Sequence, residues 1–225
     1  MSIKNTRLET RYHDNDLIEI GIDEAGRGPM VGRVYAAAVI LPINDEYKHS
    51  DMKDSKRFHS EKKIRLISEY IKKNAVGWGI GYASEKEIDA HNIRKATHTA
   101  MHRAIKQLME KLNLNGKEVH LIIDGNDFTP YMIFEDNCLI QVQSSTIEKG
   151  DNKITSIAAA SILAKVARDE YIEELCTTEP DLQTKYGLLK NKGYGTQQHL
   201  DGIREHGISQ YHRTTFGICR QFNIS

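Results

Sequence analysis

One stretch near the N-terminus constrains the fold more than any other. Leu17–Ile22 is an apolar run of strand length, and it ends on two adjacent carboxylates, Asp23 and Glu24. Burying a strand that ends in two charges is costly unless each charge is paired or bound to a cation. A glycine-rich turn, Gly26–Gly28, follows directly, and its central Arg27 suits an anionic partner. Together the two halves predict a buried strand whose end binds a divalent metal ion and a phosphate group.

Beyond this stretch, strand-like and helix-like segments alternate along the chain. Short apolar or β-branched runs predict strands, and apolar residues at helical spacing predict helices. The predicted strands are Leu17–Asp23, Arg33–Leu41, Val76–Ala83, Val119–Asp124 and Cys138–Val142, the last at a sheet edge. The predicted helices begin after the cap residues Ser60 and Ser84 and include Ile93–Leu112 and Ile154–Val166, which is apolar all round.

Such alternation predicts an α/β fold, a mixed β-sheet flanked by helices, with ligands gathering outside the strand ends. The turn between the first two strands has hairpin length, so we expect an antiparallel hairpin whose tip carries the chemistry. Residues 1–16 are polar and are interpreted as a flexible N-terminal lead, followed by the main domain at 17–178. Residues 179–225 are polar and punctuated by glycines, and they predict a small C-terminal helical appendage.

Composition limits the class of protein. Lysine plus arginine number 31, and so do aspartate plus glutamate, so the chain lacks the net positive charge typical of nucleic-acid binders. A neutral total can still hide a basic groove. Three cysteines that lie far apart predict reduced thiols and a cytoplasmic location. Residues 1–16 lack the apolar core of a secretory signal, and no apolar run approaches the ~20 residues of a membrane span.

Four carboxylates form the candidate metal site: Asp23, Glu24, Asp124 and Asp151. The first three stand where an apolar strand stops, and Asp151 precedes the apolar helix. Carboxylates without histidine or cysteine partners favour hard cations such as Mg²⁺ or Mn²⁺ over zinc. Two such ions about 3.5–4 Å apart can activate water and stabilise the leaving oxygen of a phosphodiester. Any one acid could instead be a surface charge or a helix cap, but the four contexts together favour a metal site.

Two segments near these acids are candidates for phosphate or sugar contact. Gly26 and Gly28 allow backbone N–H groups to approach a ligand closely, and Arg27 between them offers a charged fork. Ser55 and Lys56 stand in a loop ahead of a helix, where a hydroxyl and a cation could hold backbone phosphates. The alternatives are a tight hairpin turn with an exposed arginine and a solvated loop.

A basic and aromatic segment lies toward the C-terminus. Tyr194 stands between glycines at 193 and 195, with lysines just before it and His212 and Arg213 further on. A tyrosine between glycines is easily exposed and could stack on a sugar or a base. The alternative is a tyrosine packed into a turn.

Other polar pairs on helices fit structural roles better. His98 and His102 have a zinc-like i,i+4 spacing, but no further histidine or cysteine is an obvious partner. Ser161 and Lys165 resemble a nucleophile with its base, yet their helix is expected to be buried, so packing and neutralisation of a phosphate or carboxylate are favoured. The pair at 168–169 is interpreted as an ion pair that closes this helix.

Seven segments, taken together and in this order, resemble the type 2 ribonucleases H. They are IGIDEAGRGPMVGRVYAAAVILP, DSKRF, EIDAHNIRKATHTAMHRAI, LIIDGN, KGDNKITSIAAASILAKVARDEY, KGYGTQQH and HRTTF. The resemblance extends from Leu17 to Phe216 and is to the ribonuclease HII family. Ribonuclease HIII, the nearest relative, usually carries an extra N-terminal domain and lacks the intact Gly-Arg-Gly sequence, so HII is favoured. Arg33 departs from the family pattern, which often has proline there.

The resemblance implies an RNase H-like fold, with 17–178 as the catalytic domain and 179–225 as a helical segment that contacts substrate. It implies that the four carboxylates hold two ions of Mg²⁺ or Mn²⁺. It also implies that Gly26, Arg27 and Gly28 read the 2′-hydroxyl and adjacent phosphates of a ribonucleotide, and that Tyr194 packs against the neighbouring deoxyribose at an RNA–DNA junction.

The activity implied by the resemblance is that of an endoribonuclease. Family members hydrolyse the RNA strand of RNA/DNA hybrids and cut on the 5′ side of single ribonucleotides in duplex DNA, leaving 3′-hydroxyl and 5′-phosphate ends. The expected partners are therefore RNA/DNA hybrids and ribonucleotide-containing DNA, with no membrane, and the expected oligomeric state is a monomer.

Two other functions are compatible with parts of the pattern. A non-catalytic hybrid-binding module would use metals only structurally, but a binding groove has no need for clustered negative charge facing phosphate. An RNase H-like DNA nuclease or transposase-type enzyme would share the carboxylates, but DNA has no 2′-hydroxyl for the glycine turn and Tyr194 to read. Spacing alone does not bring Asp124 and Asp151 together; only the resemblance does.

Overall fold

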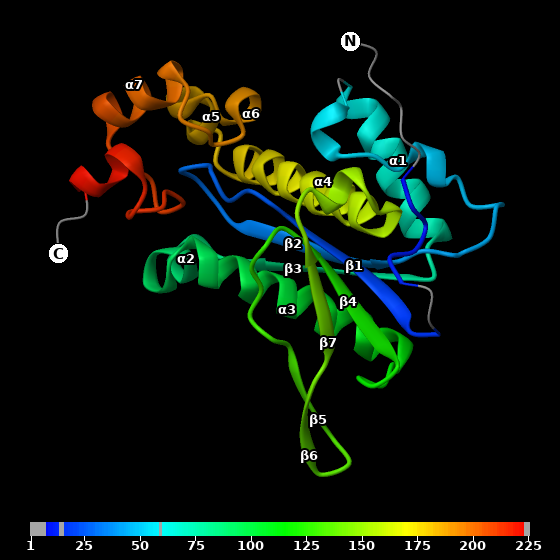
Figure 1. Ribbon diagram of the computed structural model, residues 1–225. Coiled ribbons are helices and arrows are strands. Elements are labelled where there is room, and N and C mark those ends of the chain that lie inside the picture. The colour runs from blue at the N-terminus through cyan, green and yellow to red at the C-terminus, as the bar shows by residue number, and fades with distance from the viewer. Residues whose placement is uncertain (1–7, 14–15, 59, 223–225) are drawn as a thin grey trace.

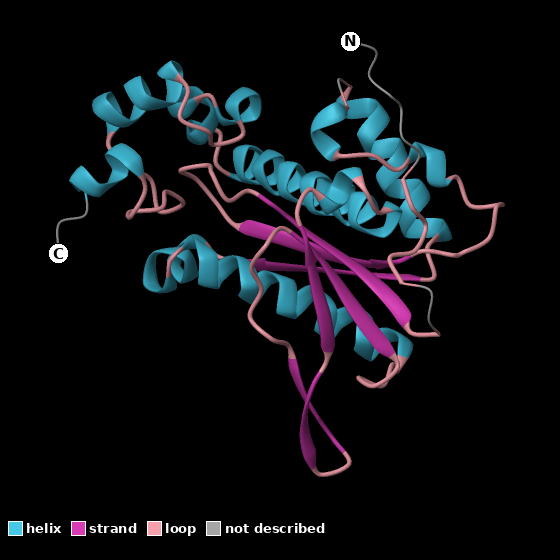
Figure 2. Cartoon of the chain, viewed as in Figure 1, coloured by secondary structure: helices cyan, strands magenta, loops and turns pink. Residues whose placement is uncertain are grey.

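A five-stranded mixed sheet forms the centre of the computed structural model, which describes residues 8–13, 16–58 and 60–222 (Figure 1, Figure 2). The strand order is β3-β2-β1-β4-β7. β1, β2 and β3 pair antiparallel, whereas β4 runs parallel to β1 and β7 runs parallel to β4. The strands of this sheet are β1 (Ile18–Ala25), β2 (Val34–Ile40), β3 (Gly77–Ala83), β4 (Val119–Asp124) and β7 (Gln143–Ile147).

Helices cover both faces of the sheet, and the predicted α/β class is confirmed. α3 lies along one face, and α4 with α1 lies along the other (Figure 1). Because successive side chains of a strand point to opposite faces, Ile20 and Ile22 join the core under α3, while Ala37 and Val39 join the core under α4. The helices are α1 (Glu61–Asn74), α2 (Glu85–His91), α3 (Ile93–Leu112), α4 (Thr155–Thr178), α5 (Asp181–Tyr186), α6 (Leu188–Asn191) and α7 (Gln197–His206). Short 3-10 turns complete the elements: η1 (His49–Asp51), η2 (Ser55–Arg57), η3 (Gly150–Asn152) and η4 (Gly217–Phe222).

The local signals for the helix starts are confirmed. The Lys63 N–H donates to Ser60 Oγ at 3.3 Å at the start of α1. At the start of α2, the Glu87 N–H donates to Ser84 Oγ at 3.3 Å, while the Ser84 N–H donates to Glu87 Oε2 at 2.9 Å. These reciprocal bonds satisfy two N–H groups that have no partner within the helix. The hairpin of β1 and β2 is antiparallel, as predicted.

One prediction about local structure is confirmed outside the main sheet, and another is wrong. The edge strand predicted at Cys138–Val142 is β6 (Cys138–Gln141), which pairs with β5 (Met132–Glu135) in a separate two-stranded hairpin. The edge of the main sheet is β7, a polar strand whose sequence QSSTI carries little apolar signal. The pair at 168–169 does not close α4, which continues to Thr178 because apolar positions such as Ile172 and Leu175 remain buried.

The segment after α4 is helical, as predicted, and it packs back on the main domain. α5, α6, α7 and η4 build a third apolar core together with residues of α4 and of the turn between β1 and β2. Val31, in that turn, forms an isolated antiparallel bridge with His212. Of the predicted lead, residues 1–7 and 14–15 lie outside the described residues, and Glu9 forms a bridge with Ile154. None of the helices in the described ranges combines the length and apolar character that crossing a membrane takes.

Candidate active site

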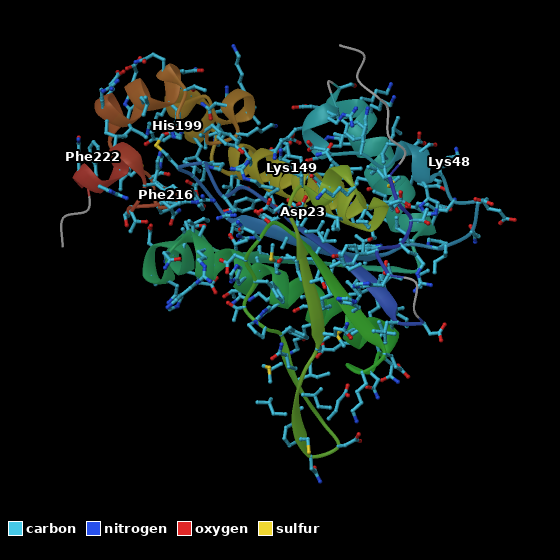
Figure 3. The ribbon with its side chains drawn as sticks, viewed as in Figure 1. Asp23, Lys48, Lys149, His199, Phe216 and Phe222 are labelled. Carbon is cyan, nitrogen blue, oxygen red and sulfur yellow. The ribbon has the colours of Figure 1, made fainter. Side chains whose placement is uncertain are left out.

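Two parallel strands bring two of the predicted carboxylates together. β1 and β4 pair with Ile22 opposite Ile123, so the next residues, Asp23 and Asp124, lie at the same edge of the sheet. Asp151 comes from η3, which follows the parallel neighbour β7 and precedes α4. One carboxylate oxygen from each of the three acids lies within 4.8 Å of the others. Figure 3 marks this position with Asp23, at the end of β1 beside α4.

Glu24 stands apart from this group of three. Since strand side chains alternate, Glu24 faces the α3 side of the sheet while Asp23 faces α4. Its Oε1 accepts a hydrogen bond from Arg27 Nη1 at 3.2 Å. Both acids nevertheless line one cavity, because they occupy the last positions of the strand. The four predicted acids are therefore a close set of three with a fourth across the strand.

Burial and mutual repulsion raise the pKa values of these acids. The pKa of Asp23 is raised well above its ordinary value, first by burial and then by the charges of Glu24 and Asp124. Burial raises the pKa of Glu24, and the charge of Arg27 opposes that shift. Burial, followed by the charge of Asp124, raises the pKa of Asp151. A site of this kind is under electrostatic strain that a divalent cation would relieve, and its oxygen-only donor set fits Mg²⁺ or Mn²⁺.

All ten residues proposed from the sequence line a single cavity of ≈ 290 Å³. Backbone and side-chain bonds fix its floor: the Gly150 N–H donates to Asp124 Oδ1 at 2.6 Å, and Asn152 Nδ2 donates to Asp151 Oδ1 at 2.9 Å. The structure thus unites segments more than a hundred residues apart in the chain. The ten residues are Asp23, Glu24, Gly26, Arg27, Gly28, Ser55, Lys56, Asp124, Asp151 and Tyr194.

The glycine turn needs its glycines for steric reasons. Gly26 has a φ of +94°, and a Cβ there would lie 2.5 Å from Cδ and Nε of Arg168. Gly28 lies against Tyr194, whose Cε1 would be 3.4 Å from an added Cβ. Arg27 and Tyr194 are both about half exposed, so they remain accessible at the mouth of the cavity. Close packing therefore fixes the glycines of this hairpin turn, while Arg27 stays half exposed beside the candidate site.

Three further residues of the cavity were not among the candidates for substrate or metal contact, although neutralisation of a phosphate or carboxylate was favoured for the pair Ser161 and Lys165. Ser161, Lys165 and Arg168 all line the cavity from α4. Ser161 Oγ donates to Ser55 Oγ at 2.8 Å, and Lys165 forms a salt bridge with Asp169. Their spacing of four and then three residues puts them on one helix face, so a polar stripe on an otherwise apolar helix was the available signal.

A smaller cavity of ≈ 200 Å³ adjoins the first and shares Glu24, Arg27 and Asp124 with it. Of the predicted histidine pair on α3, His98 lines this cavity. His98 Nδ1 lies 2.8 Å from Thr129 Oγ1, and His102 Nε2 lies 2.8 Å from the Thr129 carbonyl oxygen. Both rings are thereby tied to the loop that follows β4.

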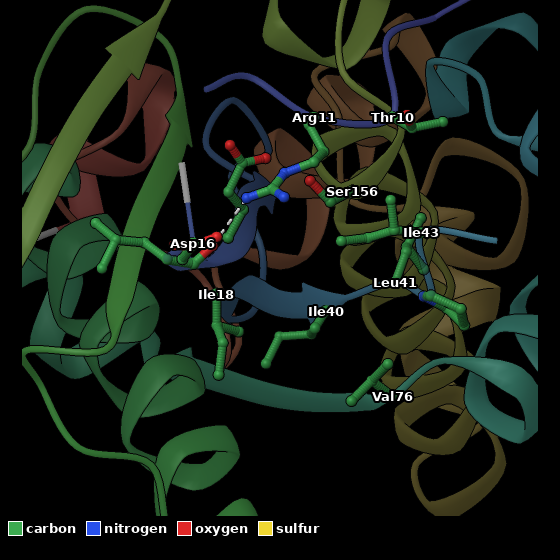
Figure 4. Close-up of a pocket in the computed structure, with 12 residues that line it drawn as sticks. Thr10, Arg11, Asp16, Ile18, Ile40, Leu41, Ile43, Val76 and Ser156 are labelled. Carbon is green, nitrogen blue, oxygen red and sulfur yellow. Dashed lines mark hydrogen bonds between the residues drawn. The ribbon is translucent and has the colours of Figure 1, made fainter. Parts of the chain in front are cut away.

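A larger cavity of ≈ 360 Å³ lies at the opposite end of β1 (Figure 4). Its lining includes Ile18, Ile40 and Leu41, together with Arg11, whose Nη2 donates to the Leu17 carbonyl at 3.2 Å. This cavity contains none of the ten predicted residues and no cluster of carboxylates. The candidate site is therefore chosen by the chemistry of the residues that line a cavity, not by the volume of the cavity.

Comparison with known proteins identifies the family of this chain and agrees with its fold. The model of the family described as ribonuclease HII matches residues 20–219. The chain belongs to the ribonuclease HII family. A ribonuclease HII of Parabacteroides distasonis is 47% identical to this chain over 92% of its length and 94% of the relative. A second, from Porphyromonas gingivalis, is 44% identical over 93% of this chain and 94% of the relative.

Solved structures of other type 2 ribonucleases H share the fold. The crystal structure of the ribonuclease H2 from Pyrococcus horikoshii superposes with a TM-score of 0.69 at 21% identity, covering 90% of this chain and 95% of that one. A structure described as Bst-RNase HIII in complex with Mn²⁺ has a TM-score of 0.62 at 18% identity, covering 84% of this chain and 70% of that one. As a member of the ribonuclease HII family, the chain is a metal-dependent ribonuclease H of type 2, an endoribonuclease that acts on RNA/DNA hybrids.

Proposed function

We propose that this ribonuclease HII also cuts on the 5′ side of single ribonucleotides embedded in duplex DNA, leaving 3′-hydroxyl and 5′-phosphate ends. One observation carries the proposal: the three close carboxylates share a cavity with the glycine turn and with a half-exposed tyrosine. A site that reads a 2′-hydroxyl next to the cleaved bond can act on one ribonucleotide, because that hydroxyl distinguishes RNA from DNA.

Asp23, Glu24, Asp124 and Asp151 would hold two divalent ions. The raised pKa values and the oxygen-only donor set support this, and the related Bst-RNase HIII is described with Mn²⁺. Bound there, the ions would supply activation of water and stabilisation of charge on the phosphate. The close approach of one carboxylate oxygen each from Asp23, Asp124 and Asp151 also supports this role.

The remaining residues of the cavity would bind and orient the substrate. The backbone N–H groups at Arg27 and Gly28 would face the 2′-hydroxyl and the adjacent phosphate, with the guanidinium of Arg27 on the phosphate. Ser55 and Lys56 would hold a second backbone phosphate on the other rim. Tyr194 would pack its exposed ring on the neighbouring deoxyribose, and Gly28 leaves the room it needs.

The organisation of the chain follows from these roles. Residues 17–178 would form the catalytic domain and residues 179–225 a segment that contacts the substrate through Tyr194, after a lead at 1–16. We expect the enzyme to act as a monomer in the cytoplasm, since its three free cysteines suit a reducing compartment.

Cleavage of three labelled duplexes tests the proposal: DNA with one ribonucleotide, DNA alone and RNA alone, each with Mg²⁺ or Mn²⁺. The expected result is a single cut 5′ of the ribonucleotide that chelator abolishes and that both controls lack. A long RNA/DNA hybrid is the positive control: its cleavage without that cut would restrict the enzyme to longer RNA stretches and refute the junction proposal.

The metal-site assignment has its own test. Asp124→Asn should abolish cleavage while leaving hybrid binding largely intact, because the side chain keeps its size and loses its charge. Glu118→Gln, a change on the loop before β4, serves as the matched control and should retain activity. Retained cleavage with lost binding in Asp124→Asn would contradict the assignment.

A further inference from the structure

Arg213 is buried in a way that its sequence context does not suggest. It is 0% exposed and is the largest fully buried side chain among the described residues. The sequence places it in a basic segment expected to face substrate, but its guanidinium lies inside the molecule, 5.0 Å from the ring centre of Phe216. Phe216 is labelled in Figure 3, on the C-terminal segment. Full burial of a charged group demands a dedicated set of partners.

The partners of this guanidinium are backbone carbonyls of the glycine turn and its continuation. Arg213 Nη2 donates to the Gly26 carbonyl at 2.6 Å, and Nη1 donates to the Arg27 carbonyl at 3.0 Å. Nε donates to the Gly32 carbonyl at 2.8 Å, and Nη2 also reaches the Arg33 carbonyl at 3.2 Å. Among the described residues no carboxylate forms an ion pair with Arg213, so carbonyl dipoles replace a counter-ion. Burial, with the nearby charge of Arg168, lowers the pKa of Arg213 to about 9.

Because the carbonyls of Gly26 and Arg27 point toward Arg213, peptide geometry fixes the direction of the N–H groups that follow them. In a trans peptide the C=O and the following N–H point in opposite directions. Drawing the carbonyls of Gly26 and Arg27 toward Arg213 therefore turns the N–H groups of Arg27 and Gly28 away from it. Within the described part of the chain neither of these two N–H groups has a hydrogen-bond partner. Both groups are therefore available to a ligand in the adjoining cavity, which Arg27 and Gly28 line.

The arginine itself stands on a fixed base. Its own N–H donates to the Met30 carbonyl at 2.8 Å, which ties the C-terminal segment to the turn a second time. The next two residues, Thr214 and Thr215, donate backbone and hydroxyl groups to both oxygens of Asp89 on α2, over 2.6 to 3.0 Å. The backbone at Arg213 is thus fixed on one side and its guanidinium is bonded to the turn on the other. A side chain fixed in this way can impose one conformation on a glycine-rich loop that would otherwise sample many conformations.

We propose that Arg213 is a positioning residue for ribonucleotide recognition: it holds the Gly26–Gly28 turn so that the Arg27 and Gly28 N–H groups face the 2′-hydroxyl and phosphate at the cleaved junction. The inference rests on the proposed function above for its catalytic consequence. Its structural half, that Arg213 orders the turn, stands without it. Lysine cannot replace the planar fork, since an ammonium cannot direct donors to four carbonyls arranged around a plane.

The test compares wild type with Arg213→Lys, which keeps the positive charge, and with Arg213→Ala. The substrate is a DNA duplex with four consecutive ribonucleotides in one strand, and the readout is the ratio of cuts at the RNA–DNA junction to cuts at internal ribonucleotides. This ratio does not depend on how much of the protein is folded. We expect it to fall at least about tenfold in Arg213→Lys, as misplaced recognition groups lose their selectivity. Arg220→Lys is the matched control, because Arg220 is exposed and, among the residues that the structure describes, its side chain donates only to the Thr215 carbonyl of its own segment.

Amide hydrogen exchange gives a second, independent readout. The peptide that covers residues 24–34 should exchange about tenfold faster in Arg213→Lys, while a peptide from α3 keeps its protection. An unchanged cut ratio together with unchanged exchange would overturn the inference. If wild type itself makes no junction cut, the proposed function fails, and the exchange experiment alone decides whether Arg213 orders the turn.

Discussion

Replacing His212 by asparagine should flatten the dependence of stability on acid pH. His199 and His212 are buried, and their Nε2 atoms lie 3.1 Å apart. The Tyr194 carbonyl, 3.0 Å from His199 Nδ1, can only accept, so that nitrogen carries the hydrogen and His199 Nε2 must accept from His212 Nε2. His212 Nδ1 then accepts from the Ser209 N–H at 2.9 Å. Each ring has one tautomer, and no position is left for another proton.

The magnitude follows from the pKa of His212. Burial, with the neighbouring His199, lowers this pKa to about 3. In the unfolded chain the ring titrates near its ordinary value of about 6.5, so below that pH the unfolded state binds a proton that the folded state excludes. The contribution to stability is therefore intact above about pH 6.5 and is lost progressively as the pH falls toward 3. At pH 5 the loss from this one ring is about 2 kcal/mol.

Urea unfolding at pH 7.5 and pH 5.0 gives the loss in the free energy of unfolding between these pH values. The effect is the difference between this loss in wild type and in His212→Asn. His212→Asn lowers the free energy of unfolding at pH 7.5, because bonds of the pair are broken. Between pH 7.5 and 5.0, however, it should lose about 2 kcal/mol less than wild type. Groups that the two proteins share contribute equally to both losses, so their contribution cancels. His206→Asn, on the exposed side of α7, is the control. Equal losses in wild type and His212→Asn would refute the reasoning.

Two further predictions concern packing and charge around β1. Asp23→Asn should stabilise the metal-free protein near neutral pH by about 1 kcal/mol, since it removes one of three carboxylates that repel one another in a buried site. The pKa of Asp23 is raised in the folded protein, so wild type loses stability as the pH rises through that pKa, and the gain from Asp23→Asn disappears in acid. Thermal melts with and without Mg²⁺ measure this gain. A variant that melts at a lower temperature than wild type, at neutral pH and without metal, would contradict the prediction. Gly21→Ala should cost about 2–3 kcal/mol in urea unfolding, because an added Cβ would lie 2.3 Å from the backbone carbon of Ser156 in α4. Gly195→Ala, whose Cβ would meet the flexible end of Met30 at 3.3 Å, is the comparison and should lose clearly less.

Structural features that depend on residues close together in the sequence could be predicted from it. α3 and β4 have the predicted bounds, because an amphipathic repeat and an apolar run ending on an acid are both local patterns. The capping box of Ser84 and Glu87 is equally local. The meeting of Asp23 with Asp124 could be expected because both end buried strands of an α/β sheet. These patterns are informative because each depends on the conformation of the backbone at the residues that form it.

Features that depend on distant partners could not be predicted in the same way. β7 has almost no apolar residues, and only its parallel pairing with β4 makes it a strand. Its neighbour Cys138–Gln141 has the stronger strand composition but pairs outside the main sheet. Arg213 resembles any surface arginine until the carbonyls 180 or more residues away supply its partners. Only the resemblance to a family, not spacing, could bring Asp151 to Asp124.

The arrangement of charge resolves why a chain with equal numbers of acids and bases can handle a polyanion. The cavity is lined by three carboxylates at strand ends, by Asp151 of η3 and by four cationic side chains from three separate segments, Arg27, Lys56, Lys165 and Arg168. At physiological ionic strength charges act over about 8 Å, so the local order of charge matters and the total of zero does not. Cations at the rim attract the phosphate backbone, while the buried acids repel it unless divalent ions intervene. With the site assigned as proposed above, nucleic acid and metal favour each other's binding, so Mg²⁺ or Mn²⁺ should increase the affinity of wild type for a hybrid more than that of Asp124→Asn.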